Sequence, residues 1–378
     1  MSRVTVLLKT NEGGMWILPQ IAEFRRRGHS VTVIIPGGDG RLRRALDAAG
    51  VPVEPSPFDF SFRPSIPRAC GLMQLRRLIR RTRPDVLFYH LYASALAARL
   101  ASFGLRVRRV HMVAGPLYLE SRPIRAVERI LCRLDDHVIA GSDYTERRYR
   151  HIGMPTRRLS AIPYGVDVKH FMAGDDRRVE LFGCSAETFV VIMVAYVYAP
   201  KSSVFPGVGI KGHDLLLDVW SDFCREHPDS LLVLVGGGFG DEGEAHRTRL
   251  IELHQAATNP RIRWLNSVED VRALYSSADL SVSPSLSENH GAALEASAMS
   301  LPSIVSDAGG LPETVTPETG WIVRAGGRTE LEAALGEAER EYRVGSLGAR
   351  GHRARLHCEE EFSHDVVLAD IADVVVGR

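Results

Sequence analysis

Two glutamates on either side of a run of small residues suggest chemistry on hydroxyl groups. Glu288 and Glu295 lie in the segment SLSENHGAALEASAM (285–299), with Gly291 between them. Carboxylates accept hydrogen bonds from vicinal hydroxyls of a sugar or a ribose, and small residues let the backbone approach a ligand closely. Two acids at this spacing also allow a glycoside hydrolase, with one acting as acid and one as base. We rank the hydrolase lower, because such pairs usually occur in barrels and sandwiches.

Lysine is rare in this chain, which makes the position of each lysine informative. It occurs only at Lys9, Lys169, Lys201 and Lys211, whereas arginine supplies the other cations. Lys211 precedes Gly212 and the apolar pattern HDLLLDVW, which predicts a helix. An anion at that point would meet both a point charge and a helix N-terminus. The alternative is a solvated surface lysine, but scarcity and placement favour anion binding.

Three glycine-bearing loops each follow a predicted strand. Gly13 and Gly14 precede a helical pattern, so their N–H groups either face an anion or form a tight turn. The spacing is not G-x-G-x-x-G, so a dinucleotide site is weakly supported. The loop at 236–238 either seats a base or ribose edge or is a plain turn. The loop at 309–310 is expected beside the Glu288 loop.

Composition limits the class of protein and its partners. The chain has 378 residues, a length that predicts two domains, and a formal net charge of +1, which excludes whole-chain attraction to nucleic acid. Basic residues cluster at 76–83 and 106–109. We interpret them as the solvated face of a helix and the start of a strand, which we favour over a binding site for a polyanion. Five scattered cysteines argue against disulfides and zinc. Without a signal peptide or an apolar run of bilayer length, we expect a cytoplasmic protein with no integral membrane association.

Apolar runs separated by helical patterns predict a doubly covered parallel sheet, twice over. The first series has strands near 3–8, 29–36, 84–91, 108–115 and 136–142, and the second near 189–197, 230–235, 261–266, 280–284, 302–307 and 320–323. The polar stretch 167–187 between them is a plausible linker. We therefore expect two tandem Rossmann-like α/β domains. Ligands of such sheets bind beyond the carboxyl ends of the strands, and a cleft between two such domains is the default site.

The motifs together resemble family-4 (group 1) retaining glycosyltransferases of GT-B fold. The resemblance rests on Glu288, EASAMSLP from Glu295 and GGLPE from Gly309, with GGMWILPQIAEFRRRGHSVTV, AIPYGVDVKHF and KGHDLLLDVW in family order. It covers nearly the whole chain. The chain departs from the family pattern at Tyr196, where arginine is usual, at Tyr164 and at Ser300. The Glu288–Glu295 spacing is also one residue shorter. Lys201 or an arginine from elsewhere would then supply the missing charge.

The resemblance implies a fold and an activity. The implied GT-B fold has an acceptor-binding domain over 1–170, a nucleotide-sugar-binding domain over 171–358, and a C-terminal helix over 359–378 that packs back on the first domain. The implied reaction is the retaining, metal-independent transfer of a sugar from a nucleoside-diphosphate sugar, without a cofactor. The residues matching the family's site divide into catalytic Lys211, Glu288 and His111, donor-binding Gly14, Tyr196, Lys211, Gly237, Glu288, Asn289, His290, Gly291, Ala292 and Glu295, and acceptor-binding His90 and Tyr118.

Two other functions fit the same architecture. One is a nucleotide-sugar 2-epimerase, which would release a changed sugar without an acceptor, and the other is a nucleotide-sugar-binding protein without turnover. Uridine and guanosine donors both remain open. Polysaccharide, lipid-linked sugar, natural-product aglycone and small metabolite are all possible acceptors. Nearly neutral charge and the lack of a long basic amphipathic helix favour a soluble acceptor.

Overall fold

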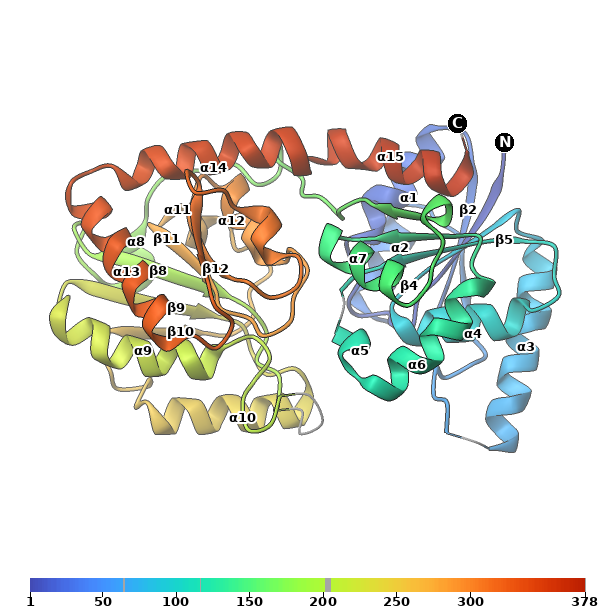
Figure 1. The fold of residues 1–378 in the computed structure, drawn as a ribbon, viewed down its shortest axis with the longest axis horizontal. Helices are drawn as coiled ribbons and strands as arrows, with labels where there is room; N and C mark the ends of the chain where they lie inside the picture. The colour runs from blue at the N-terminus through green and yellow to red at the C-terminus, as the bar shows by residue number, and fades with distance from the viewer. Residues whose placement is uncertain (64, 116, 201–204, 378) are drawn as a thin grey trace. The chain divides into compact units, whose positions relative to one another are not determined.

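The computed structural model describes residues 1–63, 65–115, 117–200 and 205–377, which form two compact units. Unit 1 comprises Met1–Tyr164 and the last helix, and unit 2 comprises Gly165–Ser363. The sequence placed these boundaries at 170/171 and 358/359. Each unit contains a parallel sheet with helices on both faces (Figure 1). The expected class, two Rossmann-like α/β domains, is confirmed.

Unit 1 is built on a seven-stranded parallel sheet in its described part. Its strands are β1 (Arg3–Leu7), β2 (Ser30–Ile35), β3 (Val53–Pro55), β4 (Val86–His90), β5 (Arg108–Val113), β6 (His137–Ala140) and β7 (Leu159–Ala161), in the order β3-β2-β1-β4-β5-β6-β7. Successive side chains of a strand point to opposite buried faces of this sheet. Val6 and Phe88 belong to the core cluster on one face, and Leu7 and Leu87 belong to the cluster on the other. Side chains alternate across a strand, so a strand covered on both faces reads as a continuous apolar run.

The helices of unit 1 supply those two covers. They are α1 (Ile17–Arg26), α2 (Arg41–Ala48), α3 (Ile66–Thr82), α4 (Tyr92–Ser102), α5 (Leu117–Glu120), α6 (Arg122–Leu131), α7 (Asp143–His151) and α15 (His364–Val376). Helices α1, α2 and α15 pack on the face that carries Val6. Helices α3 and α4 pack on the face that carries Leu7.

The predicted C-terminal helix returns to unit 1, but it begins at His364 and not at residue 359, because the chain breaks at Ser363. The last residues of α14 (Leu347–Phe362) belong to unit 2, and Ser363 has an extended backbone that pairs with Val166. The chain then enters α15, which returns to unit 1. There Arg27 forms an ion pair with Asp373 and donates to the Ala369 carbonyl at 3.0 Å.

Unit 2 has a six-stranded parallel sheet in the described residues. Its strands are β8 (Phe189–Val194), β9 (Ser230–Val235), β10 (Ile262–Leu265), β11 (Leu280–Ser283), β12 (Ser303–Ser306) and β13 (Gly320–Val323), in the order β10-β9-β8-β11-β12-β13. The helices before α14 are α8 (Arg178–Phe182), α9 (His213–Glu226), α10 (Gly240–Leu253), α11 (Arg272–Ser276), α12 (Ala292–Ala298) and α13 (Arg328–Arg343). Strands β8 and β11 are neighbours, so the loops that follow them leave the same edge of the sheet.

The polar stretch at 167–187 is part of unit 2 and not a free linker. Arg178 forms an ion pair with Asp279 at 2.9 Å, and only 9% of its side chain is exposed. Phe182 is buried in the core beside β8. Paired charges inside a core look polar in a sequence, which explains why composition suggested a linker. No helix in the described ranges is long and apolar enough to cross a membrane.

Candidate functional site

Lys211 and Glu288 form an ion pair at the carboxyl edge of the unit 2 sheet. Lys211 lies at the end of the loop that follows β8, and Glu288 lies in the loop between β11 and α12. About a fifth of each side chain is exposed, so the pair is mostly buried but open on one side. The structure thus brings together two residues that the sequence assigned to catalysis.

Two glycines make this close approach possible. Gly212 has a φ of +81°, and a Cβ there would collide with the carbonyl oxygen of Pro284, at the start of the Glu288 loop. Gly309 has a φ of +62°, and a Cβ there would collide with the carbonyl oxygen of Glu288. Only glycine adopts such backbone angles without strain and leaves that space empty. The loops after β8, β11 and β12 are therefore packed together through their backbones.

The ion pair fixes the charge of both partners. Burial would raise the pKa of Glu288, but the attraction of Lys211 outweighs it and holds that pKa below its usual value. Burial would also lower the pKa of Lys211, and Glu288 reverses this, so the pKa of the lysine is raised. Both groups are charged at neutral pH. Glu288 is consequently a hydrogen-bond acceptor, and Lys211 is a cation at the start of α9.

The residues after Glu288 shape the rest of this loop. The backbone N–H of Asn289 donates to Glu288 Oε1 at 3.0 Å, which orients the carboxylate. Asn289 and His290 are buried, and His290 Nε2 lies 3.5 Å from Glu313 Oε2. Gly291 is exposed and leads into α12 at Ala292. The predicted donor residues 288–291 thus lie in one loop, and Ala292 begins α12.

Glu295 lies in the first turn of α12 and has an unusual pKa. Burial raises its pKa to about 7, and a hydrogen bond from the Tyr275 hydroxyl at 3.5 Å only partly opposes this. Tyr275 is fully buried and also donates to the carbonyl of Ala292 at 3.4 Å. The described structure gives no direct contact between Glu295 and Glu288. Tyr275 was not predicted, since nothing in its local sequence indicates its partner.

An aromatic cluster flanks Lys211 where the sequence had singled out Tyr196. Tyr196 follows β8, is 47% exposed, and lies with its ring 6.1 Å from that of Phe239. The rings of Tyr198 and Phe239 stack with their centres 4.8 Å apart. Lys211 Nζ lies 6.0 Å from the centre of the Tyr198 ring. Lys201, the expected substitute charge, lies outside the described residues. In the described part of this loop the aromatic rings, not a guanidinium, stand nearest to Lys211.

The glycine loop after β9 is tied to the same segment. Gly237 accepts a hydrogen bond from the backbone N–H of Val197 at 3.0 Å, and its own N–H donates to Ser267 Oγ at 3.1 Å. Phe239 N–H donates to the Val197 carbonyl at 2.8 Å. This ladder holds Gly237 and the aromatic cluster in one rigid unit. Gly237 is partly exposed.

In unit 1, Gly14 and His90 lie near each other through Trp16. A Cβ on Gly14 would contact Trp16 at 3.9 Å, and the Trp16 ring lies 4.7 Å from the ring of His90. His90 ends β4, is fully buried, and shares a hydrogen bond with the Tyr164 hydroxyl at 2.9 Å. Burial lowers its pKa well below the usual value, so the ring is neutral. Tyr164, a departure from the family pattern, therefore supports His90.

His111 lies inside the core of unit 1, which changes how its predicted role is understood. It is fully buried in β5, and Arg99 donates to its Nδ1 at 3.3 Å. A guanidinium only donates, so Nδ1 accepts and the proton of the neutral ring lies on Nε2. The pKa of His111 is lowered, by burial first and then by Arg99. With no exposed surface, the His111 side chain is not open to direct contact with a ligand in this structure.

The neighbours of His111 form a buried polar network that the sequence did not predict. Arg99 forms ion pairs with Glu128 at 2.7 Å and with Asp135, and all three side chains are fully buried. Tyr149 donates to Glu128 at 2.7 Å and shares a hydrogen bond with Tyr118, the predicted acceptor residue. Tyr118 also stacks on Tyr92 with ring centres 4.7 Å apart. The network ties Tyr118 of α5 to the core, and Arg99, the single charged residue of α4, was its one sequence signal.

No group of three histidine, cysteine, aspartate or glutamate side chains in the described ranges has the arrangement to hold a metal ion. The expectation that the reaction needs no metal stays a prediction.

Comparisons with known proteins place this geometry in context. The family described as "Glycosyltransferase Family 4" matches residues 18–170, and "Glycosyl transferases group 1" matches residues 202–339. A D-inositol 3-phosphate glycosyltransferase of Corynebacterium kroppenstedtii is 28% identical over 60% of this chain and 51% of its own length. A GDP-mannose-dependent monoacylated alpha-(1-6)-phosphatidylinositol monomannoside mannosyltransferase of Corynebacterium glutamicum is 28% identical over 62% of this chain and 60% of its own. The chain thus spans about half the length of the first of these relatives.

Among solved structures, Anabaena Alr3699/HepE in complex with UDP-glucose superposes with a TM-score of 0.82. It is 19% identical, and the match covers 100% of both chains. At that identity the likeness shows the fold, which is the two-domain fold described above. The two family models, both described as glycosyltransferases, match most of unit 1 and most of unit 2 respectively.

Proposed function

Because this chain belongs to the family-4, group 1 glycosyltransferases, we propose that it transfers a sugar from a nucleoside-diphosphate sugar to an acceptor hydroxyl. The observation that supports this most is the Lys211–Glu288 pair, a cation and a hydroxyl acceptor side by side at one sheet edge. A nucleoside-diphosphate sugar carries a partner for each residue: its diphosphate matches Lys211, and the hydroxyl groups of its sugar match Glu288. The retaining outcome and the absence of a metal belong to the proposal.

Lys211 binds the diphosphate of the donor in this scheme. It stands at the start of α9, a helix of 14 residues whose first turn has no side-chain cap in the described structure. The free N–H groups of such a turn and the helix dipole add positive potential beside the ammonium group. As the bond from the sugar to the phosphate breaks, negative charge grows on the leaving oxygen, and these groups stabilise it.

The two glutamates recognise the hydroxyls of the donor. Glu288 is ionised and accepts hydrogen bonds from the sugar, with Asn289, His290 and Gly291 shaping the loop around it. Glu295 accepts hydrogen bonds from the ribose, which favours its ionised form. Because the pKa of Glu295 is about 7, ribose binding displaces a proton at slightly acidic pH. Tyr196 and Gly237 border the same region.

The chemical step needs no covalent intermediate. The acceptor oxygen attacks the anomeric carbon on the face from which the diphosphate departs. A carbon–oxygen bond to the acceptor forms, the bond to the phosphate oxygen breaks, and the acceptor proton passes to the leaving diphosphate. No described side chain near Glu288 is a convincing nucleophile. The protein therefore contributes positioning and charge stabilisation.

The acceptor is proposed to be a hydroxyl compound bound by unit 1. The names of the two relatives, an inositol phosphate glycosyltransferase and a phosphatidylinositol monomannoside mannosyltransferase, point to inositol-based acceptors for those proteins. In this chain, His90 and Tyr118 are the residues proposed to border the acceptor site. Tyr118 is partly exposed and His90 is buried.

A substrate panel tests the proposal. The protein is incubated with UDP-, GDP- and dTDP-sugars, with and without hydroxyl acceptors that include inositol phosphates, and the products are identified by mass spectrometry and NMR. We expect one donor to yield a glycoside with retained anomeric configuration. A changed sugar released without acceptor would identify an epimerase, and donor binding without turnover would identify a binding protein. An inverted product would contradict the proposed mechanism.

A further inference from the structure

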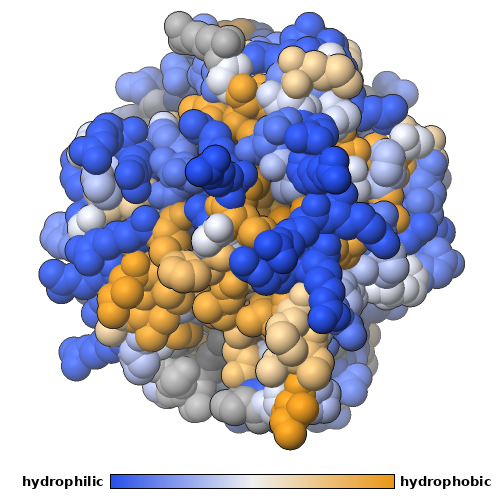
Figure 2. Space-filling view, turned by 90° about the vertical axis from the view of Figure 1, so that its right-hand side faces the viewer, coloured by the Kyte–Doolittle hydropathy of each residue, from blue (hydrophilic) through white to orange (hydrophobic). Residues whose placement is uncertain are grey.

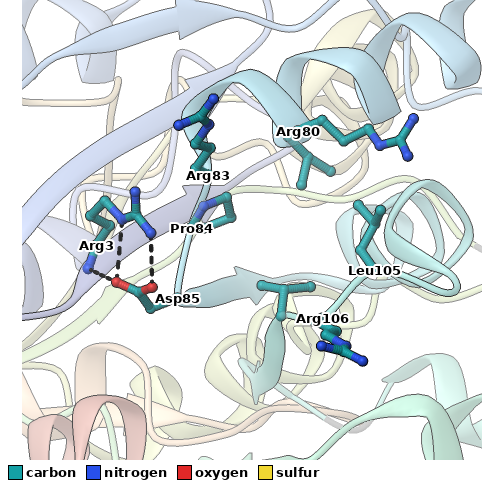
Figure 3. A pocket seen from close by; sticks show the side chains of 9 residues that line it. Arg3, Arg80, Arg83, Pro84, Asp85, Leu105 and Arg106 are labelled. Atoms are coloured by element: carbon teal, nitrogen blue, oxygen red, sulfur yellow. Dashed lines mark hydrogen bonds and ion pairs between the residues drawn. The ribbon is translucent and has the colours of Figure 1, made fainter.

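A hollow of about 270 Å³ lies at the amino edge of the unit 1 sheet (Figure 3). Arg3 begins β1, and Asp85 and Val107 directly precede β4 and β5. These strands are parallel, and β4 lies between β1 and β5. His90 ends β4 at the opposite edge, about 16 Å along the strand from Asp85 at about 3.3 Å per residue. The hollow is therefore separate from the residues proposed to border the acceptor.

Positive charge is in excess around this hollow. Among the described residues of its lining, Asp85 is the one acidic side chain, and Arg3 already occupies it. Arg3 Nη2 lies 3.0 Å from Asp85 Oδ1, and the Arg3 backbone N–H donates to Oδ2 at 2.8 Å. The side chains of Arg80, Arg83 and Arg106 are exposed and have neither a hydrogen bond nor an ion pair with any described residue. Three cations thus face the hollow without a counter-charge from the described chain.

The local structure does not by itself account for these three cations. Arg81, from the same segment, pairs with Glu54 at 2.7 Å, so an arginine here can be bound by the protein itself. A cation in the last turn of a helix also interacts favourably with the helix dipole. That effect applies to Arg80 and Arg83 at the end of α3, but not to Arg106 in the loop between α4 and β5.

Arg83 occupies a backbone position that suits glycine better than arginine. It follows the last residue of α3 with a φ of +45°, and Pro84 comes next. Left-handed residues at helix ends are usually glycine, and a proline favours extended backbone in the residue before it. Arginine in this conformation costs free energy that glycine avoids. The presence of arginine therefore favours a role for its guanidinium group outside folding.

The arrangement of the guanidinium groups indicates the chemistry of a ligand. In Figure 3, Arg80 and Arg83 extend from the side of α3 and Arg106 from the opposite side, and the three groups point in different directions. A single phosphate suits such divergent groups poorly, whereas separate phosphates on one molecule can each meet a guanidinium group, which binds phosphate through two parallel hydrogen bonds. Leu105 and Val107 add partly exposed apolar lining for the carbon atoms of a ligand. Sites for drug-sized ligands have about 300–1,000 Å³, so this smaller hollow fits a small metabolite.

We propose that this arginine hollow (Arg80, Arg83, Leu105, Arg106 and Val107) binds a small soluble organic anion that carries two or more separate phosphate groups on a ring. The phosphates contact the arginines at its rim, and the ring lies on the apolar lining. Helix α3 is on the side that faces the viewer in Figure 2, where strongly hydrophilic side chains border hydrophobic ones, so the ligand reaches the hollow from solvent. The site lies at the other edge of the sheet from the proposed acceptor residues, so its occupancy does not depend on sugar transfer.

Calorimetric titration of the full chain with adenosine 3′,5′-bisphosphate tests the proposal, and adenosine 5′-monophosphate is the matched probe that lacks one phosphate. Each probe is titrated into the wild type and into Lys211→Met, because Lys211 is proposed to bind phosphate groups of the donor. We expect both proteins to bind the bisphosphate more tightly than the monophosphate. Arg80→Gln/Arg106→Gln should weaken bisphosphate binding about 10- to 25-fold, because each exposed charge pair contributes up to about fivefold in affinity.

Arg83→Gly separates binding from folding. The variant loses one guanidinium group, so we expect bisphosphate binding to weaken up to about fivefold. Its melting temperature should not fall, because glycine suits the φ of +45° at this position. Bisphosphate binding equal to that of the wild type would contradict the role given to Arg83.

A matched control removes the same charge outside the hollow. Arg77→Gln/Arg249→Gln changes one exposed arginine of α3 and one of α10, neither of which lines the hollow, and should bind the bisphosphate like the wild type. Equal weakening by this pair and by Arg80→Gln/Arg106→Gln would overturn the proposal, because total charge would then explain the binding. Loss of bisphosphate binding in Lys211→Met would also overturn it, since the binding would then belong to the donor site. Bisphosphate binding that is absent, or no tighter than monophosphate binding, would contradict it as well.

Discussion

Replacing Lys211 by methionine tests the central ion pair, since methionine keeps most of the aliphatic stem and removes the charge. The donor diphosphate would lose one electrostatic contact, so we expect single-turnover transfer to slow on the order of 10²- to 10³-fold. Folding stability should also fall. Removing one partner of a fully buried ion pair lowers the free energy of unfolding by about 3–5 kcal/mol. For an exposed pair the loss is about 0–1 kcal/mol. With a fifth of each side chain exposed, we expect about 1–3 kcal/mol.

The stability loss should depend on pH in a defined direction. In the wild type the pKa of Glu288 is below its usual value near 4.5, so the pair contributes stability above that pH and loses it in acid. In Lys211→Met the largest opposition to burial is removed and only the Asn289 N–H and His290 still lower the pKa of Glu288, so this pKa is higher than in the wild type. The stability difference between wild type and variant should therefore grow from pH 4 to pH 7 in urea unfolding.

A second substitution separates stability from catalysis. Lys211→Met/Glu288→Gln removes the uncompensated charge and should recover most of the lost stability while transfer remains slow. Transfer by Lys211→Met within a factor of three of the wild type, with the donor and acceptor found in the substrate panel, would refute the diphosphate role. A stability difference that does not change with pH would refute the account of the ion pair.

Four further outcomes follow from the geometry. Binding of an intact nucleotide-sugar should weaken as pH falls below 7 in the wild type and stay constant in Glu295→Gln, because the ionised carboxylate accepts hydrogen bonds from ribose hydroxyls more strongly than the protonated form and glutamine does not titrate. Calorimetry from pH 5.5 to 8 measures this dependence. The same raised pKa means that the folded state binds more protons than the unfolded one between pH 4.5 and 7. The wild type should thus lose on the order of 3 kcal/mol of stability across that window relative to Glu295→Gln, and parallel unfolding curves would contradict this. Arg99→Met should cost about 3–5 kcal/mol, since it leaves Glu128 and Asp135 buried without a cation, whereas Arg249→Met on the surface should change stability by less than about 0.5 kcal/mol in urea unfolding. Gly309→Ala should abolish donor binding and lower the melting temperature, because its Cβ would meet the Glu288 carbonyl, while Gly28→Ala, also at positive φ but in open space, should cost only about 1 kcal/mol. Equal effects of the two alanines would show that backbone strain alone is responsible.

The long strands and the loops at their ends were predictable because they depend on local sequence. Continuous apolar runs identified all the longer strands of both sheets. The edge strands β3 and β7 were missed, since each has only three residues and its pairing depends on the neighbouring strand. The break at Ser363 was missed for a similar reason: it depends on a bridge to Val166, nearly two hundred positions away along the chain.

In the candidate site, too, local sequence predicted individual residues but not the contacts between distant segments. Lys211 and Glu288 were predicted separately, from scarcity and from small neighbours, and the structure joins them because Gly212 and Gly309 allow three loops to touch. The aromatic flank formed by Tyr198 and Phe239 was not predicted, because residues from two different loops make it. His111 shows the limit of motif matching, which gives a position in the sequence and not the direction of a side chain.

Calorimetric titration of UDP and GDP into the wild type and Lys211→Met tests the central claim most directly. We expect one of the two diphosphates to bind the wild type and Lys211→Met to weaken this binding at least about tenfold, because one charge-assisted contact is worth about 1.4 kcal/mol or more. Lys211→Arg should retain part of the affinity. Equal affinity of wild type and Lys211→Met for the diphosphate that binds would contradict the donor site described here, as would a failure of the wild type to bind UDP, GDP or dTDP.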